Sequence, residues 1–347
     1  MRYLLAILLL CLAVETGATV RLVGDLPRRD DAPLRAIAGL ETEYGAVRTS
    51  EGARLRTILT RPAGASGPLP ALFVAQWVSC GTIDFNPERP SLLRELATRS
   101  GLVMIRVERS GTGDSEGVPC ARLDYDTEVR HYREALDQLS RHAWVDPERI
   151  VIHGISLGAT TAPLIAEGRR VAGLLVQGGG ALTHVERMIN FDRIFLERSG
   201  GYRPEQIHGE MLRRIRFHQE YLVGGRMPAE VEAAHPELRG VWSAIRGAEP
   251  SSHYGRPFAW HQQAARRDFL AAWARIEAPV MVVYDEYDQL EPRHGHRLIA
   301  DTVDRLRPGT ASFVEIPGAD HELEIYPSAE AAYRGEGGEV RMELFLE

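Results

Sequence analysis

Lysine is absent from this sequence: all 41 residues counted as Lys or Arg are arginine. Mechanisms that need a catalytic lysine, such as Schiff-base chemistry, are therefore excluded. An excess of positive charge is also absent, because 48 acidic residues give a formal net charge of −7 at pH 7. This negative balance argues against a nucleic-acid partner.

Long apolar runs are absent except at the N-terminus. Arg2 precedes an apolar run from residue 3 to 14, which is too short to span a bilayer as a free helix. Small residues follow, and cleavage after Ala18 would suit them. We expect residues 1–18 to be a signal peptide, with export to the periplasm or beyond and no membrane span after its removal. An uncleaved membrane anchor is the alternative.

Cysteine is scarce, with three residues in a chain of 347. Cys11 lies in the expected signal peptide, which leaves Cys80 and Cys120. Both follow predicted strands, in loops on the same edge of the expected sheet, so an oxidising compartment favours a disulfide between them. Two free buried thiols are the alternative. No Cys-x-x-Cys or His-x-x-x-His pattern is found, so no metal site is expected.

Short apolar segments alternate with helical patterns along most of the chain. This rhythm predicts an α/β fold with a doubly wound, mostly parallel sheet covered on both faces. Residues 19–40 are expected to form a loosely attached leader. A hairpin is predicted at 42–49 and 54–60, further strands at 71–75, 102–107, 150–153, 171–176, 279–284 and 311–316, and helices at 91–100, 126–142, 292–306 and 328–346.

The rhythm stops between residues 181 and 276, where the pattern is helical and rich in arginine and aromatic residues. This segment follows the sixth predicted strand and is far too long for a simple loop. We expect a helical lid over the carboxyl edge of the sheet, where such sheets bind ligands. The core then consists of residues 19–180 and 277–347.

A Gly-x-Ser-x-Gly sequence joins a predicted strand to a predicted helix. The apolar run 150–153 leads into Gly154, Ser156 and Gly158, and small residues follow. A sharp turn between a strand and a helix places the serine hydroxyl at the top of the sheet and needs neighbours without side chains. Ser156 is therefore the predicted nucleophile.

A serine nucleophile needs a base and a carboxylate that holds this base. They are expected at the ends of later strands, in the order acid and then histidine. His321 follows the last predicted strand and is the predicted base. Asp288 follows the strand at 279–284 and is the preferred acid, with Asp285 and Glu286 as alternatives.

Attack on a carbonyl also requires hydrogen-bond donors for the oxyanion. The backbone N–H of Leu157 is one expected donor. The second is expected from the loop after residue 75, from Trp77 or Val78. Gln76 would orient this loop or donate from its side chain.

These motifs resemble the α/β-hydrolase fold superfamily, in its serine hydrolase branch of prolyl-oligopeptidase-like and S15/S33-type enzymes. The resemblance runs from about residue 42 to the C-terminus and depends on four segments. They are His153-Gly154-Ile155-Ser156-Leu157-Gly158, Arg109-Ser110-Gly111-Thr112-Gly113-Asp114-Ser115, Glu286-Tyr287-Asp288 and Gly318-Ala319-Asp320-His321. The family usually has His-Gly where this chain has Gln76-Trp77, and a glycine where it has Asp285.

The sequence thus predicts an exported serine hydrolase that cleaves an ester or amide of a small molecule or peptide through an acyl-enzyme, without a cofactor. An exopeptidase would need a lid carboxylate for the substrate amine, and the lid offers four candidates. An acyltransferase and a catalytically silent binding protein are further alternatives. The four candidate carboxylates are Glu186, Glu197, Glu205 and Glu210.

Overall fold

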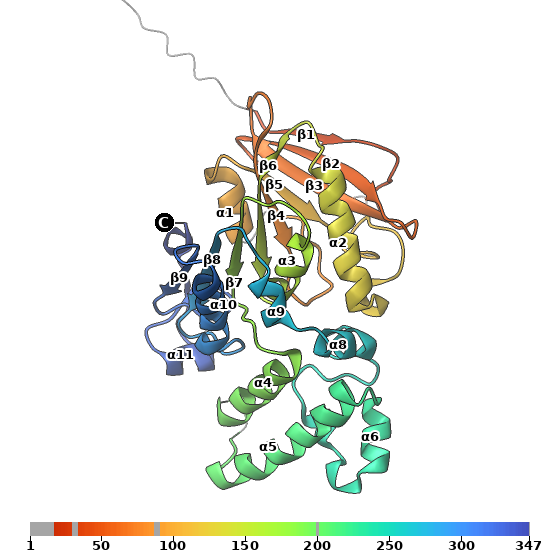
Figure 1. Ribbon diagram of the computed structural model, residues 1–347, viewed down its shortest axis with the longest axis vertical. Coiled ribbons are helices and arrows are strands. Elements are labelled where there is room, and N and C mark those ends of the chain that lie inside the picture. Colours follow the sequence, from red (N-terminus) through yellow and green to blue (C-terminus); the bar gives the residue numbers. More distant parts are fainter. Residues whose placement is uncertain (1–16, 30–33, 87–90, 199–200, 347) are drawn as a thin grey trace, which may run out of the picture.

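The chain forms a nine-stranded sheet in the computed structural model, which describes residues 17–29, 34–86, 91–198 and 201–346 (Figure 1). The strand order is β1-β2-β3-β5-β4-β6-β7-β8-β9. Strands β2 and β3, and β3 and β5, pair antiparallel, and every pair from β5 to β9 is parallel. The predicted, mostly parallel sheet is confirmed. Its strands are β1 (Thr19–Leu22), β2 (Leu40–Arg48), β3 (Arg54–Pro62), β4 (Leu69–Ala75), β5 (Val103–Val107), β6 (Val145–Ile155), β7 (Gly173–Gln177), β8 (Val280–Asp285) and β9 (Ala311–Ile316).

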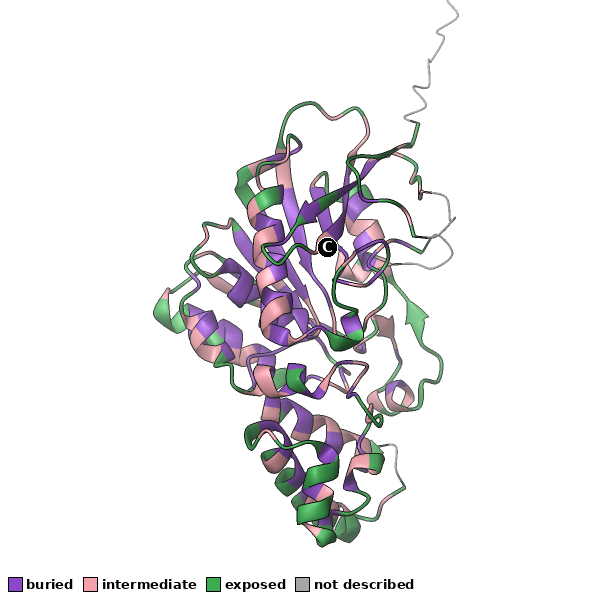
Figure 2. Cartoon of the chain, turned by 90° about the vertical axis from the view of Figure 1, so that its right-hand side faces the viewer, coloured by how far each residue is buried: buried purple, intermediate pink, exposed green. Residues whose placement is uncertain are grey.

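Helices cover both faces of this sheet. On one face, Leu72 and Val74 of β4 pack with α1 (Leu92–Arg99). On the other, Phe73 packs in a larger core with helices α2, α3 and α10. Buried strand residues thus point to alternate faces, as a sheet buried on both sides requires (Figure 2). The bounds of these three helices are Tyr125–Leu139, Gly158–Ala166 and Arg293–Leu306.

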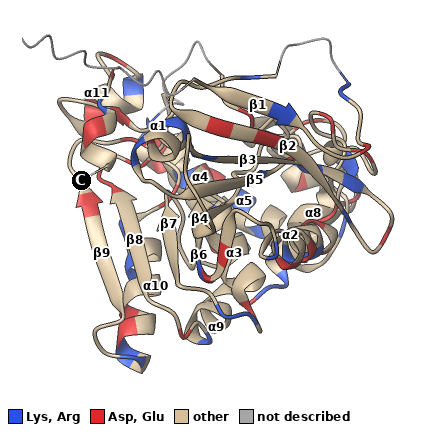
Figure 3. Ribbon diagram, turned by 90° about the horizontal axis from the view of Figure 1, so that it is seen from above, with Lys and Arg blue, Asp and Glu red and all other residues tan. Residues whose placement is uncertain are grey.

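Charged side chains are absent from strands β4 and β7 in the middle of the sheet, whereas strands β1 and β2 at one edge carry them (Figure 3). Burial of an unpaired charge is costly, so the arginines that are buried inside the sheet are paired: Arg56 of β3 contacts Asp114 and Arg106 of β5 contacts Asp84.

The insertion between β7 and β8, residues 181–276, is helical in its described part and lies at the carboxyl edge of the sheet (Figure 1). It has its own apolar core around Phe217 and Tyr221. Its last helix, α9, packs instead on α10 and α3, so this helix belongs to the main core. The helices are α4 (His184–Arg198), α5 (Pro204–His218), α6 (Pro228–Ala234), α7 (Val241–Ala244), α8 (Phe258–Ala265) and α9 (Phe269–Ala274), with a π-helix at Gln219–Val223 and a 3-10 turn at Pro236–Leu238.

The expectation of a loose leader at residues 19–40 is wrong. Strand β1 pairs in parallel with β2, Leu26 is buried, and the Arg28 guanidinium contacts the Asp114 carboxylate. This extra edge strand also makes β7 the seventh strand rather than the sixth. The expected signal peptide lies outside the described residues except for Gly17 and Ala18. Among the described helices, none is long and apolar enough to cross a membrane.

The helix predicted at 328–346 is also largely wrong. Helix α11 (Ala329–Arg334) ends at Arg334, because Gly335 adopts a left-handed backbone conformation that closes it. The chain then pairs β11 (Glu339–Val340) antiparallel with β10 (Glu324–Ile325) and ends in a 3-10 turn. Gly337 and Gly338 are poor helix formers, and their effect outweighs the helical pattern around them.

Replacing Ile105 of β5 with alanine should destabilise the fold by about 2–5 kcal/mol, because the side chain is fully buried and its loss leaves a cavity. Met281→Ala on β8 is the matched control, since this strand side chain is exposed, and we expect a change within about 0.5 kcal/mol. Chemical denaturation of both variants measures the difference. Equal losses would contradict the assignment of the core.

Candidate active site

Ser156 lies at a sharp turn between β6 and α3, with a backbone φ of 53°. The turn forces close backbone contacts: a Cβ on Gly154 would lie 2.5 Å from the carbonyl oxygen of Gly158. A Cβ on Gly158 would lie 2.1 Å from the carbonyl oxygen of Ala75. Only glycine fits either position, which explains the Gly-x-Ser-x-Gly pattern. The Ser156 N–H donates to the carbonyl of Gln177 at 2.8 Å, which ties the turn to β7.

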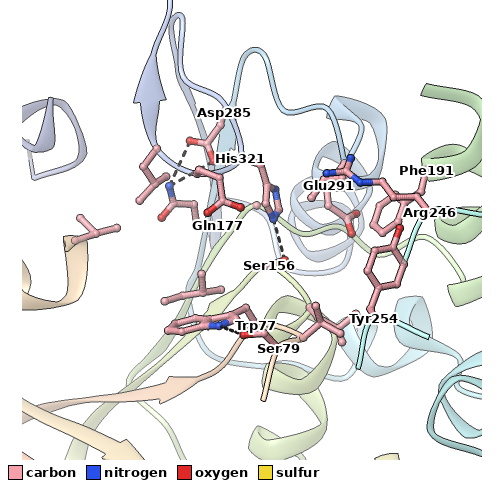
Figure 4. Close-up of a pocket in the computed structure, with 18 of the residues that line it drawn as sticks. Trp77, Ser79, Ser156, Gln177, Phe191, Arg246, Tyr254, Asp285, Glu291 and His321 are labelled. Carbon is pink, nitrogen blue, oxygen red and sulfur yellow. Dashed lines mark hydrogen bonds between the residues drawn. The ribbon is translucent and has the colours of Figure 1, made fainter. Parts of the chain in front are cut away.

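The structure brings Ser156, His321 and Asp288 into one hydrogen-bonded chain, although 165 residues separate the serine from the histidine. Ser156 Oγ lies 3.0 Å from His321 Nε2 (Figure 4), and His321 Nδ1 lies 2.8 Å from Asp288 Oδ2. The tautomer that donates Nδ1–H to Asp288 leaves Nε2 free to accept from the hydroxyl. Asp288 Oδ1 accepts from the amides of Leu290 and Glu291, both at 2.8 Å, which fixes the carboxylate.

Electrostatics couple the two ionisable members of this chain. Burial alone would raise the pKa of Asp288, but attraction to His321 and its hydrogen bonds outweigh burial and hold the pKa below its usual range. Burial likewise opposes the charged form of His321, and the Asp288 carboxylate reverses this and raises the pKa of His321 to about 9. The carboxylate therefore strengthens the imidazole as a base.

The other acids considered from the sequence contact different partners. Asp285 accepts weak hydrogen bonds from Gln177 Nε2, at 3.3 and 3.4 Å. Burial, with a contribution from the Asp288 charge, raises the pKa of Asp285 to about 7. Glu286 accepts from the N–H of Gly318 at 2.8 Å. Of the three candidates, the structure places only Asp288 at hydrogen-bond distance from His321.

The expected oxyanion donors surround the serine. Leu157 is the N-cap residue directly before α3, and Trp77 and Val78 lie in the loop after β4; all three line the same cavity as Ser156. Outside the regular helices and strands, the described chain contains no backbone hydrogen bond that is donated by the N–H of Leu157, Trp77 or Val78. Gln76 points away, since its Nε2 donates to the carbonyl of Val107 at 2.7 Å. Its side chain therefore orients the loop and does not face the serine.

A cavity of about 560 Å³ opens above Ser156, between the sheet edge and the insertion. Its walls are mainly apolar and include Leu93 of the core and Met188 of α4. Trp77 of the core and Phe191 of α4 lie on different sides of this cavity (Figure 4). The size suits a small organic molecule. No group of three or more His, Cys, Asp or Glu side chains in the described residues is placed to hold a metal ion.

The four insertion glutamates suggested for binding a substrate amine are not among the residues that line this cavity. Glu186 accepts from Thr183 at the start of α4, and the other three each pair with a nearby arginine. Local ion pairs on a solvated face explain these residues better than substrate binding. The cavity instead contains Glu291, which forms a buried ion pair with Arg187.

Cys80 and Cys120 form a disulfide, with their Cα atoms 5.8 Å apart. Cys80 lies in the loop that carries Trp77 and Val78, and the Arg256 guanidinium of the insertion donates to Cys120 Sγ at 2.7 Å. The sequence pattern favours a solvated face for the insertion arginines, Arg256 among them, with a site for an anionic substrate as the alternative; the structure instead buries Arg256 against Glu128. Nothing in the sequence distinguishes a buried charge from the many exposed ones.

Comparison with known proteins agrees with this fold. A model of the alpha/beta hydrolase family matches residues 75–333. Since this match covers most of the chain, the protein belongs to the alpha/beta hydrolase family. The narrower branch suggested by the motifs stays a prediction.

Three individual relatives illustrate the range of the family. The polyketide transferase ATR5 of Stachybotrys chlorohalonatus (strain IBT 40285) is 38% identical over 115 residues, which are 32% of this chain and 35% of that protein. The chain thus matches about a third of that relative's length. The structure of DcsB with its substrate analogue has a TM-score of 0.52 and 17% identity, over 85% of this chain and 96% of that chain. Hypothetical protein PA2218 of Pseudomonas aeruginosa has a TM-score of 0.50 and 16% identity, over 87% and 92%. At these identities the two structures are alike in fold alone.

Asp285→Asn should stabilise the fold at pH 8 but not at pH 4. The pKa of Asp285 is about 7 when folded against an ordinary 3.8, so folding retains a proton that the unfolded chain releases, and stability falls as pH rises between these values. The asparagine side chain does not ionise, so the variant avoids this loss of folding stability, which is roughly 4 kcal/mol at most. Denaturant unfolding at both pH values tests it, with the exposed Asp301→Asn as control. Equal stabilisation at both pH values would contradict the argument.

Proposed function

We propose that the protein is an exported serine hydrolase that cleaves a carboxylic ester through an acyl-enzyme. The observation that carries this proposal is the hydrogen-bonded chain of Ser156, His321 and Asp288 at the floor of an apolar cavity. The disulfide and the apolar N-terminal run both suit export to the periplasm or the medium.

In the proposed mechanism, His321 Nε2 takes the proton of Ser156 as Oγ adds to the ester carbonyl carbon. The carbonyl electron pair moves onto oxygen, and the N–H groups of Leu157 and of Trp77 or Val78 stabilise the oxyanion. The oxyanion then re-forms the carbonyl, the ester C–O bond breaks, and His321 gives its proton to the leaving alcohol. A water molecule, deprotonated by His321, attacks the acyl-enzyme in the same way, and cleavage of the bond to Ser156 Oγ releases the acid. Asp288 holds the imidazole in the required tautomer and stabilises its protonated form.

Esters are favoured over peptides by the cavity walls. An exopeptidase site would hold the substrate amine with an accessible carboxylate, and the insertion glutamates pair elsewhere. Glu291 is neutralised by its partner Arg187, so it attracts a cation weakly. The apolar surface from Met188 and Phe191 suits the hydrocarbon part of an ester.

Acyl transfer to an acceptor other than water is the second candidate. It is supported by the partial likeness to a polyketide transferase, since the two reactions share the acyl-enzyme and differ in the group that resolves it. Product analysis with added alcohols or amines distinguishes them: a hydrolase yields mainly the free acid, and a transferase yields mainly the new ester or amide.

Wild-type mature protein should hydrolyse short to medium p-nitrophenyl esters, and Ser156→Ala should lower the rate by at least roughly 1000-fold, because no nucleophile remains. A panel of aminoacyl p-nitroanilides is assayed beside the esters, and circular dichroism confirms that the variant folds. Undiminished ester turnover in the variant would refute the serine mechanism. Preference for the anilides would identify a peptidase instead.

Asp288→Asn should shift the acid limb of the kcat/KM profile to lower pH. Only neutral His321 accepts the serine proton, so activity rises as pH passes through the His321 pKa, which the Asp288 carboxylate raises to about 9. Loss of the Asp288 charge lowers the pKa of His321 and also reduces the maximum of the kcat/KM profile by roughly 1000- to 10,000-fold. A pH series with a fluorogenic ester measures both. An acid limb that stays in place would assign the limb to another group.

A further inference from the structure

Arg109 holds the loop that carries the second proposed oxyanion donor. Its guanidinium donates to three acceptors of this loop: Nη1 to Gln76 Oε1 at 2.8 Å and to the carbonyl of Ser79 at 2.7 Å, and Nη2 to the carbonyl of Trp77. Arg109 is buried, so water does not compete for these bonds. One planar, forked cation thus fixes the loop on both sides of Val78.

Glu128 of α2 connects Arg109 to the helical insertion. One carboxylate oxygen accepts from Arg109 Nε at 2.6 Å. The other accepts from Arg256 and, at 2.9 Å, from Trp260 Nε1, and both of these residues belong to the insertion. The four side chains are buried, and we call them the Glu128 cluster. Burial alone would raise the pKa of Glu128, but the two guanidinium groups outweigh it and hold the pKa below its usual range.

The disulfide joins the same assembly. Arg256 Nη1 lies 2.7 Å from Cys120 Sγ and 3.4 Å from Cys80 Sγ, and Cys80 is the residue after Ser79. The loop is therefore held at Gln76 and Ser79 by Arg109 and at Cys80 by a covalent bond. Any displacement of the loop would separate buried charges from their partners, which is strongly unfavourable.

We propose that Arg109 is a positioning residue for the oxyanion site and that Arg256 of the insertion completes this function through Glu128. The proposal rests on the proposed function. As Ser156 Oγ adds to the carbonyl carbon, negative charge develops on the carbonyl oxygen, and the amide of Trp77 or Val78 has to be in place before this happens. The Glu128 cluster keeps it there. In this arrangement the insertion is part of the catalytic geometry as well as a cover.

Arg109→Lys tests this proposal, because lysine keeps the charge but cannot reach three acceptors with a fork. We expect kcat for a p-nitrophenyl ester to fall roughly 10- to 100-fold while KM stays within roughly 3-fold, since the loop acts on the transition state. The inhibition constant of a trifluoromethyl ketone, which forms an oxyanion on Ser156, should rise by the same factor as kcat falls. Unchanged kcat, or a loss that appears in KM alone, would overturn the proposal.

Arg56→Lys is the matched control. Arg56 is also buried, pairs with Asp114 at 3.0 Å and donates to the carbonyls of Gly45 and Leu26, none of which belongs to the oxyanion loop. This variant should lower the denaturation midpoint and leave kcat unchanged. Equal losses of kcat in both variants would reduce Arg109 to a general structural role.

Arg256→Lys tests the contribution of the insertion, and a smaller loss in kcat of roughly 3- to 10-fold is expected because its effect passes through Glu128. Full activity in this variant would overturn the part of the proposal that concerns the insertion. If Arg109→Lys does not fold, Arg256→Lys and the ketone carry the test.

The rate at which a fluorophosphonate labels Ser156 separates failure of this proposal from failure of the proposed function. A wild-type protein that turns over no ester but is labelled would refute the hydrolase assignment only, and slower labelling of Arg109→Lys than of Arg56→Lys would still support the positioning role. Equal labelling of the two variants would overturn that role, and no labelling of the wild type would overturn both.

Discussion

The close approach of three backbone segments at the carboxyl edge of the sheet is the constraint on which the site depends. A Cβ at Gly158 would lie 2.1 Å from the carbonyl of Ala75, and a Cβ at Gly179 would lie 2.2 Å from the carbonyl of Ser156. The ends of β4, β6 and β7 therefore meet around the serine. Its strained φ is maintained because packed main chain surrounds it, as is typical of functional residues. The hydroxyl, the Leu157 amide and the loop after β4 are consequently placed by rigid elements.

Buried charge is the second theme of this structure. Asp288 contacts His321, and despite burial this attraction holds the pKa of the carboxylate below its usual range. Glu291 contacts Arg187, but burial outweighs this attraction and raises the pKa of Glu291 to about 7. Asp285 accepts from Gln177 rather than from a cation, and burial likewise raises its pKa to about 7. A buried carboxyl group with a raised pKa destabilises the fold when it ionises, and such destabilising groups are concentrated at functional sites. Asp285 fits that pattern, because it lies three residues before Asp288 and lines the cavity.

The sequence was sufficient for the features that local chemistry controls. Strands buried on both faces are apolar runs, and the Gly-x-Ser-x-Gly turn has to contain glycine, so Ser156 could be located directly. His321 and Asp288 followed because parallel strands end at one edge. The predictions of a loose leader at residues 19–40 and of a helix at 328–346 were wrong. Strand β1 has only four residues and cannot be recognised without its partner β2, and Gly335 ends a helix that the surrounding pattern favours. The Glu128 cluster could not be predicted, since its charges come from three distant segments and only burial distinguishes them.

The insertion contacts the core at α8 and at α4, and buried charged groups take part in both contacts. At α8, Trp260 packs on Tyr125 and Leu157 of the core and also donates to Glu128. Moving α8 would expose this apolar surface and leave a buried carboxylate with one partner fewer, so two large costs coincide there. At α4, Arg187 forms a buried ion pair with Glu291 of the core, and Met188 and Phe191 of the same helix line the cavity with apolar surface. Charged contacts therefore hold α4 as well as α8, and the unbranched Met188 is the side chain of this wall that adapts most readily to different occupants.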